Sequence, residues 1–161
     1  MRTLILILSI TIYLTAFGQD TLNTGFVNKA EAKNLIVNGK KEGKWVEFTD
    51  EYGEIVTDTT WIYYSLIIYK NGKAIGIARQ YYSNGKLYVE SRYRNGELNG
   101  IMKSYYENGK LEFEANYINN EPNGTANEYW QSGKLKCKHY FTMGAQNIKA
   151  TCFDENGNEI K

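Results

Sequence analysis

The sequence lacks the residues that most catalytic and metal sites need. Its 161 residues include one histidine, His139, and two cysteines that do not form a Cys-x-x-Cys pair. One histidine cannot form a histidine cluster for a metal ion. There is no nucleophile elbow for a serine hydrolase, and the glycines fall at hairpin turns rather than in a phosphate-binding loop before a helix. We therefore expect no catalytic residues, no cofactor and no metal.

Paired carboxylates are the remaining route to catalysis, because glutamates are numerous. A glycosidase needs two carboxyl groups that face each other across a cleft. Glu112 and Glu114 are expected on the side of a strand opposite Phe113, where charge is solvated. The sequence therefore predicts that the protein is not an enzyme, and a hydrolase is the weakest alternative.

A large charge of one sign is also lacking. The chain carries 19 basic and 18 acidic residues, and loss of Arg2 with an N-terminal leader would make these numbers equal. A neutral protein has no long-range field to attract phosphate backbones or anionic lipids. We therefore expect neither nucleic acid nor an acidic membrane surface as a partner.

The N-terminus has the three parts of a secretory signal peptide. Arg2 gives a positive start, residues 4–14 are mostly apolar, and Ala16-Phe17-Gly18 offers small residues before Gln19. The apolar run of about 11 residues is too short to span roughly 30 Å of bilayer as a helix. We predict a signal peptide over residues 1–18, with an uncleaved anchor as the alternative. The expected location is outside the cytoplasm (periplasmic, outer-membrane-associated or secreted) in a Gram-negative-type bacterium.

After the leader, residues 19–35 are a polar lead-in with at most a short helix, and residues 36–161 repeat. Glycines mark a period of 24 residues in two series: Gly85, Gly109, Gly133 and Gly157, and Gly76, Gly100 and Gly124. Tyr69, Tyr93 and Tyr117 keep the same period, and Tyr140 follows after 23. A first unit opens near Asn38, with Gly43 in the place of Gly76 and about nine extra residues. A fixed period of this length indicates a solenoid or array.

Each unit reads as a β-hairpin. In one unit, residues 77–82 and 86–93 flank Asn84-Gly85, and both turn residues tolerate the positive φ of a type I′ turn. Leu87, Val89 and Ser91 alternate with polar residues, so we expect them to share one buried face. The sequence thus predicts an all-β fold, an elongated single-sheet meander of about five hairpin repeats.

The outgoing strands carry adjacent aromatic residues: Tyr81-Tyr82, Tyr105-Tyr106 and Tyr129-Trp130. Neighbours on a strand point to opposite faces, so one ring of each pair should be in the core. Because tryptophan is the largest apolar group in the set, we place Tyr82, Tyr106 and Trp130 inside. Tyr81, Tyr105 and Tyr129 are then an exposed stripe and the predicted partner-binding residues. The alternative is that these rings only stabilise a thin sheet by cross-strand stacking.

The unit that begins at Gly76 reads Gly-x4-Tyr-Tyr-x-Asn-Gly-Lys-Leu-x5-Tyr-x-Asn-Gly. It resembles the bacterial variant of the MORN repeat. Proteins with this repeat are often described as YwqK-family antitoxin components. The resemblance covers about residues 38–161 and is specific for three units between Tyr69 and Tyr140. It implies a MORN-like solenoid of hairpins that binds rather than catalyses.

Cys137 and Cys152 are equidistant from a turn near Gly144-Ala145. Opposite positions would allow a disulfide, which persists in an oxidising compartment. A one-residue change of register would put the two thiols on opposite faces, where each would be buried separately. The sequence leaves both alternatives open.

The function that we predict is that of a non-catalytic, exported protein-interaction module. The alternative is an antitoxin or immunity protein that neutralises a toxin by covering it, and a glycan-binding protein is a weaker alternative. A protein partner is expected in the first two cases, and a toxin in the second.

Overall fold

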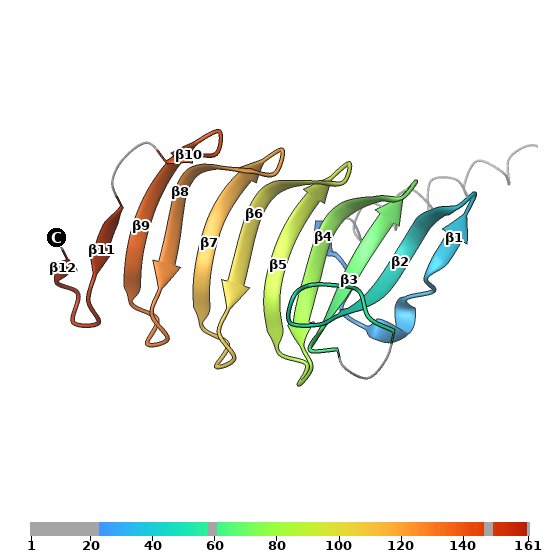
Figure 1. The fold of residues 1–161 in the computed structure, drawn as a ribbon, viewed down its shortest axis with the longest axis horizontal. Helices are drawn as coiled ribbons and strands as arrows, with labels where there is room; N and C mark the ends of the chain where they lie inside the picture. The colour runs from blue at the N-terminus through green and yellow to red at the C-terminus, as the bar shows by residue number, and fades with distance from the viewer. Residues whose placement is uncertain (1–22, 58–60, 147–149, 161) are drawn as a thin grey trace, which may run out of the picture.

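The computed structural model describes residues 23–57, 61–146 and 150–160. Their strands form one twelve-stranded antiparallel sheet in which consecutive strands are neighbours, except that β10 and β11 both pair with β9. Figure 1 shows the hairpins side by side in one extended row. A short 3-10 helix, η1 (Lys29–Glu31), precedes the sheet. This architecture confirms the predicted all-β single-sheet meander.

The strands are β1 (Leu35–Val37), β2 (Lys40–Thr49), β3 (Tyr63–Lys70), β4 (Lys73–Tyr82), β5 (Leu87–Arg94), β6 (Glu97–Tyr105), β7 (Leu111–Ile118), β8 (Glu121–Tyr129), β9 (Leu135–Thr142), β10 (Ala145–Gln146), β11 (Thr151–Phe153) and β12 (Glu159–Ile160). The predicted signal peptide, residues 1–18, lies outside the described residues. In the described part of the chain, no helix has the length and apolar character needed to cross a membrane.

The glycine series that contains Gly76, Gly100 and Gly124 has a packing role, because each member lies opposite an aromatic residue on the neighbouring strand. The directly opposed pairs are Gly43 and Tyr69, Gly76 and Tyr93, Gly100 and Tyr117, and Gly124 and Phe141. A residue without a side chain leaves room for the ring on the same face of the sheet. Phe141, rather than Tyr140, therefore completes the aromatic series. Tyr140 lies opposite Thr125 and is 48% exposed.

A bulge near the start of each return strand changes which residues share a face. Tyr81 pairs with Leu87 and Gln80 pairs with Val89, so Tyr88 is an extra residue in β5. The same shift makes Glu112 and Lys136 the extra residues of β7 and β9. A bulge breaks the strict alternation of side chains. The prediction that Leu87 and Val89 share one face is therefore wrong, because Leu87 lies opposite Tyr81 on the other face.

Two kinds of turn alternate along the array. The turns that join units, such as Asn95-Gly96, have two residues with positive φ (55° and 89°), as a type I′ turn requires. Inside a unit, by contrast, Gly85 has a φ of 83°, whereas the φ of Asn84 is not positive. The Gly85 amide donates to the Tyr82 carbonyl. This is a type I turn followed by a glycine bulge. The predicted type I′ geometry at Asn84-Gly85 is wrong, although the predicted hairpin position is right.

The most fully buried cluster lies where the lead-in crosses the sheet. Phe26 packs on Tyr64, Leu66 and Ile68 of β3, and Leu66 has no exposed surface. The lead-in passes behind the strands in Figure 1. We call the side that it covers the lead-in face, and the other side the opposite face.

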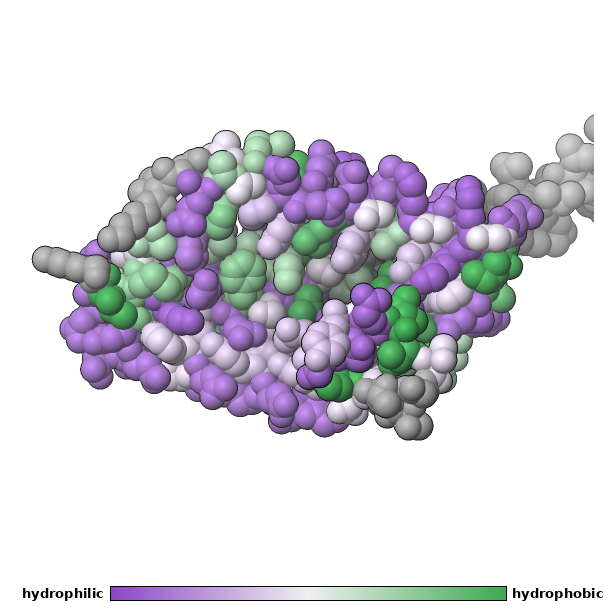
Figure 2. Space-filling model, in the orientation of Figure 1, coloured by the Kyte–Doolittle hydropathy of each residue, from purple (hydrophilic) through white to green (hydrophobic). Residues whose placement is uncertain are grey.

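The opposite face carries mostly small residues along its middle. Ala78, Ser91, Met102, Ala115, Ala126 and His139 follow one another across six strands. Ala115 and Ala126 are almost completely buried by the larger side chains beside them. Figure 2, which looks onto this side, shows small and apolar residues along the middle between hydrophilic margins.

The in-unit turn makes Gly109 the most direct test of the turn geometry. Its φ is 81°, and a β-carbon placed there would meet no atom within 4 Å, so only backbone strain opposes a side chain. We expect Gly109→Val to lower the free energy of unfolding by about 1–3 kcal/mol, measured by urea denaturation. Gly109→Asn is the control and should cost clearly less, because asparagine tolerates positive φ. Equal losses for both variants would contradict the strain account.

Candidate functional site

The second aromatic residue of each pair joins its repeat to the next one. Its polar hydrogen is donated to a backbone carbonyl 23 residues further along the chain: Tyr82 to Tyr105 at 3.1 Å, Tyr106 to Tyr129 at 2.6 Å, and Trp130 to Phe153 at 3.0 Å. These three rings lie on the opposite face and are half-buried. Each of these rings therefore makes a structural contact between repeats. They do not face the Phe26 cluster, against which Tyr81 packs instead.

The lysine after each in-unit turn makes a second contact of the same kind. Lys86 Nζ donates to the Glu107 carbonyl at 2.6 Å, Lys110 Nζ to Ser132 at 2.8 Å, and Lys134 Nζ to Glu155 at 2.7 Å. At the other ends of the strands, the amide of each later type I′ turn donates to the preceding unit, as Gly96 does to the Ala74 carbonyl at 2.8 Å. The lysines that follow the in-unit turns and the amides of the interunit turns thus both join neighbouring units.

Tyrosines gather on the opposite face where the array begins. Tyr88 stacks on Tyr63 with ring centroids 4.9 Å apart and contacts Tyr82 at 4.8 Å. Burial raises the pKa of Tyr82 to about 12, and the nearby Tyr88 and Glu112 add to the shift. The Tyr82 hydroxyl is therefore neutral at physiological pH, and the cluster is a packing unit.

The predicted partner-binding stripe does not behave as one set. Tyr81 stacks on Tyr64, with centroids 4.9 Å apart and planes 12° from parallel, and packs against the Phe26 cluster. Tyr105 and Tyr129 occupy the equivalent places one and two units further on, where the described lead-in does not reach, and they are half-buried. Burial raises the pKa of Tyr105, and the neighbouring Lys103 opposes this shift. The structure thus gives Tyr81 a packing role and leaves Tyr105 and Tyr129 on the open part of the face.

The open half of the lead-in face is the surface formed by Ile101, Lys103, Tyr105, Tyr129 and Tyr140. Register places these side chains on one side of β6, β8 and β9, the side that also carries Tyr81. Ile101 is 53% exposed and Tyr140 is 48% exposed. Sequence reasoning missed Ile101, although its 24-residue spacing from Ile77 was available as a signal.

Charged pairs cross the lead-in face at the repeat interval. Arg79 Nε lies 2.8 Å from Glu90 Oε2, and one unit later Lys103 Nζ lies 2.9 Å from Glu114 Oε2. The hydrogen bond from Lys103 to Glu114 raises the pKa of the lysine. Glu112, by contrast, accepts a hydrogen bond from Ser104 Oγ at 3.1 Å on the opposite face. The expected grouping of Glu112 with Glu114 is wrong, because the bulge separates them onto different faces.

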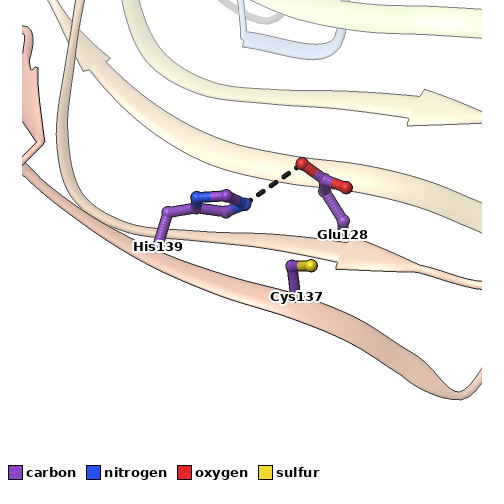
Figure 3. Close-up of side chains that lie close together, drawn as sticks. All are labelled: Glu128, Cys137 and His139. Carbon is purple, nitrogen blue, oxygen red and sulfur yellow. Dashed lines mark hydrogen bonds and ion pairs between the residues drawn. The ribbon is translucent and has the colours of Figure 1, made fainter. Parts of the chain in front are cut away.

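Near the end of the array, Glu128, Cys137 and His139 lie together on the opposite face. Figure 3 shows the carboxylate of Glu128 directed at the ring of His139, whose Nε2 is 3.1 Å from Oε1. One carboxylate oxygen, one ring nitrogen and one sulfur lie within 4.8 Å of one another. The sulfur is bonded, however, so it cannot be a thiolate ligand. The pair that is left supplies two donors, fewer than a closed zinc site needs.

The bond to that sulfur comes from Cys152, which lies directly opposite Cys137 in the pairing of β9 with β11. The two cysteines are 15 residues apart in sequence. Of the two alternatives that the sequence leaves open, the structure thus contains the disulfide. It ties the last regular strand to the terminal pair of short strands.

These features define an all-β repeat protein whose units are joined edge to edge. The family model described as MORN repeat variant matches residues 75–95, 98–119 and 122–142. The chain therefore contains an array of three MORN-variant repeats, each running from near the start of one outgoing strand (β4, β6 or β8) through the in-unit turn to the end of the return strand that follows. A search of curated proteins finds no match to the chain.

The role of Tyr106 can be separated from that of Tyr105 by removing the hydroxyl oxygen of each. Tyr106→Phe deletes the donor to the Tyr129 carbonyl, so we expect the free energy of unfolding to fall by about 0.5–1.5 kcal/mol. Tyr105→Phe is the matched control, because the Tyr105 hydroxyl has no hydrogen-bond partner in residues 23–57, 61–146 and 150–160. Chemical denaturation of both variants measures the difference. A Tyr105→Phe loss as large as that of Tyr106→Phe would contradict this assignment.

Proposed function

We propose that this chain is an exported, non-catalytic module that binds a protein partner through the open half of its lead-in face. The observation that carries the proposal is the division of this face. The lead-in covers the first part with Phe26, whereas Ile101 and Tyr140 are exposed further along. Tyrosine is enriched at protein interfaces and among their hot-spot residues.

The repeats support this function because an array presents the same chemical groups at regular intervals along one surface. Lys103 and Tyr105 lie beside each other on β6, and Tyr129 follows one unit later on β8. The surface combines aromatic rings with a paired charge, so it suits a protein surface better than a small ligand. Residues 23–35 belong to the same proposal, since this part of the lead-in determines how much of the face is covered.

Export is supported by two observations of different kinds. The N-terminal sequence has the pattern of a cleaved signal peptide. The disulfide between Cys137 and Cys152 belongs to the chemistry of an oxidising compartment. We infer cleavage after Gly18 and a mature chain that begins at Gln19.

The proposal is tested by capture of proteins from an envelope fraction of the native host on the immobilised mature chain. We expect a defined set of captured proteins to be lost when Tyr105 and Tyr129 are both replaced by alanine, because aromatic hot-spot residues typically cost about 2 kcal/mol or more of binding free energy. Quantitative mass spectrometry measures the loss.

Tyr52→Ala is the matched control. Tyr52 is 82% exposed and lies in the segment after β2, away from the proposed surface. It should leave capture unchanged. Capture that survives the double alanine variant while circular dichroism shows an intact fold would overturn the proposal.

A further inference from the structure

The lead-in itself shows how this face of the sheet receives an extended chain. Residues 23–26 cross from β5 to β3, and arginine side chains of the sheet bind one backbone oxygen and one side-chain oxygen of this segment. Arg79 Nη1 donates to the Thr24 carbonyl at 2.7 Å, and Arg92 Nη2 donates to Asn23 Oδ1 at 3.1 Å. One cation of the sheet thus binds a backbone carbonyl of the crossing chain, and a second binds a side-chain amide oxygen.

Gly25 makes the closest approach of this crossing. A β-carbon at Gly25 would lie 2.8 Å from the Ile77 carbonyl oxygen and 2.8 Å from Arg79 Nη1. Its φ of 67° also disfavours other residues. A glycine is thus needed where the chain passes over the isoleucine and arginine of β4.

The same arrangement recurs one repeat later without the lead-in above it. Ile101 takes the place of Ile77, and the Lys103–Glu114 pair takes the place of the Arg79–Glu90 pair. Ile77 is half-buried, whereas Ile101 is 53% exposed. The sheet therefore presents a second copy of the surface that the lead-in already occupies in its first copy.

A hollow of about 230 Å³ lies between these two copies. Ile77 and Ile101 supply its apolar walls, and Arg92, Lys103 and Glu90 supply its charges. Glu90 is paired with Arg79. Among residues 23–57, 61–146 and 150–160, the Arg92 guanidinium uses one of its five N–H donors, for Asn23. The hollow thus has donors to spare next to an aliphatic wall.

We propose that this hollow binds an extended segment of the partner protein, with a glycine over Ile101, an aliphatic residue beside it, and an acidic side chain on Arg92. The inference rests on the proposed function and names its ligand. Lys103, like Arg79, would donate a hydrogen bond to a main-chain carbonyl of the segment. The segment is therefore extended, because the main-chain carbonyls of a helix already accept hydrogen bonds within the helix. An acidic side chain fits because carboxylates pair with guanidinium in a two-bond geometry.

The probe is a library of random linear 12-residue peptides displayed on phage and selected on the mature chain. We expect the enriched peptides to share a glycine, an adjacent aliphatic residue and an acidic residue. A synthetic copy of an enriched peptide should bind at least tenfold more weakly when its glycine is replaced by alanine. Ile101→Ser should weaken binding at least fivefold, measured by isothermal titration calorimetry.

Ile36→Ser is the matched control, because Ile36 is similarly exposed (58%) but lies on β1 at the far edge of the sheet. It should leave peptide affinity unchanged. Arg92→Ala should remove the preference for an acidic residue in a repeated selection. These variants change exposed side chains, and circular dichroism verifies that each one is folded.

Three results would overturn the inference. They are selection of peptides that bind the Ile101→Ser variant equally well, failure to enrich any linear peptide, and nuclear Overhauser contacts that place residues 19–22 of the chain itself against the Ile101 methyl groups. If these occur while capture of envelope proteins still depends on Tyr105 and Tyr129, this inference fails and the proposed function stands. If capture of envelope proteins does not depend on Tyr105 and Tyr129 either, both this inference and the proposed function are wrong.

Discussion

A single sheet has no second layer against which its side chains can be buried, and this constraint shapes the whole molecule. The chain meets it by joining each repeat to the next at both ends of the strands. Tyr106 donates to the Tyr129 carbonyl and Lys110 to the Ser132 carbonyl at one end, while the Gly96 amide donates to Ala74 at the other. A glycine opposite each large ring, as at Gly100 and Tyr117, keeps the rings packed against the sheet. Stability is therefore a property of neighbouring units rather than of one central core.

The lead-in changes this picture at one end and creates the division on which the functional account depends. Phe26 supplies the missing layer over Leu66 and Ile68, so the first hairpins have a true core. Tyr81 packs against this core, whereas its equivalents Tyr105 and Tyr129 lie on the part of the face that the described lead-in does not cover. The central claim is that the covered half is structural and the open half binds. Under the proposed function, one type of repeat thus provides both a core and an interface.

The sequence predicts what depends on period and on turn residues. The 24-residue glycine spacing gave the hairpins, their order and the opposed directions of Tyr105 and Tyr106. It could not give the bulges, because Tyr88, Glu112 and Lys136 have no side-chain chemistry in common, and a bulge is a matter of pairing between strands. The docking of residues 23–32 was equally hidden, since a short polar segment with one phenylalanine has no periodicity. Register also decided between the two alternatives for Cys137 and Cys152, and register is set in space.

Hydroxyl-radical footprinting of the tyrosines in the isolated mature chain, and again after addition of envelope proteins, tests the central claim most directly. In the isolated chain, Tyr140, Tyr105 and Tyr129 should be oxidised faster than Tyr64 and Tyr81. Added envelope proteins should protect the first three and leave Tyr52 unchanged. Equal oxidation of Tyr81 and Tyr105 in the isolated chain, or protection confined to Tyr52, would contradict the account.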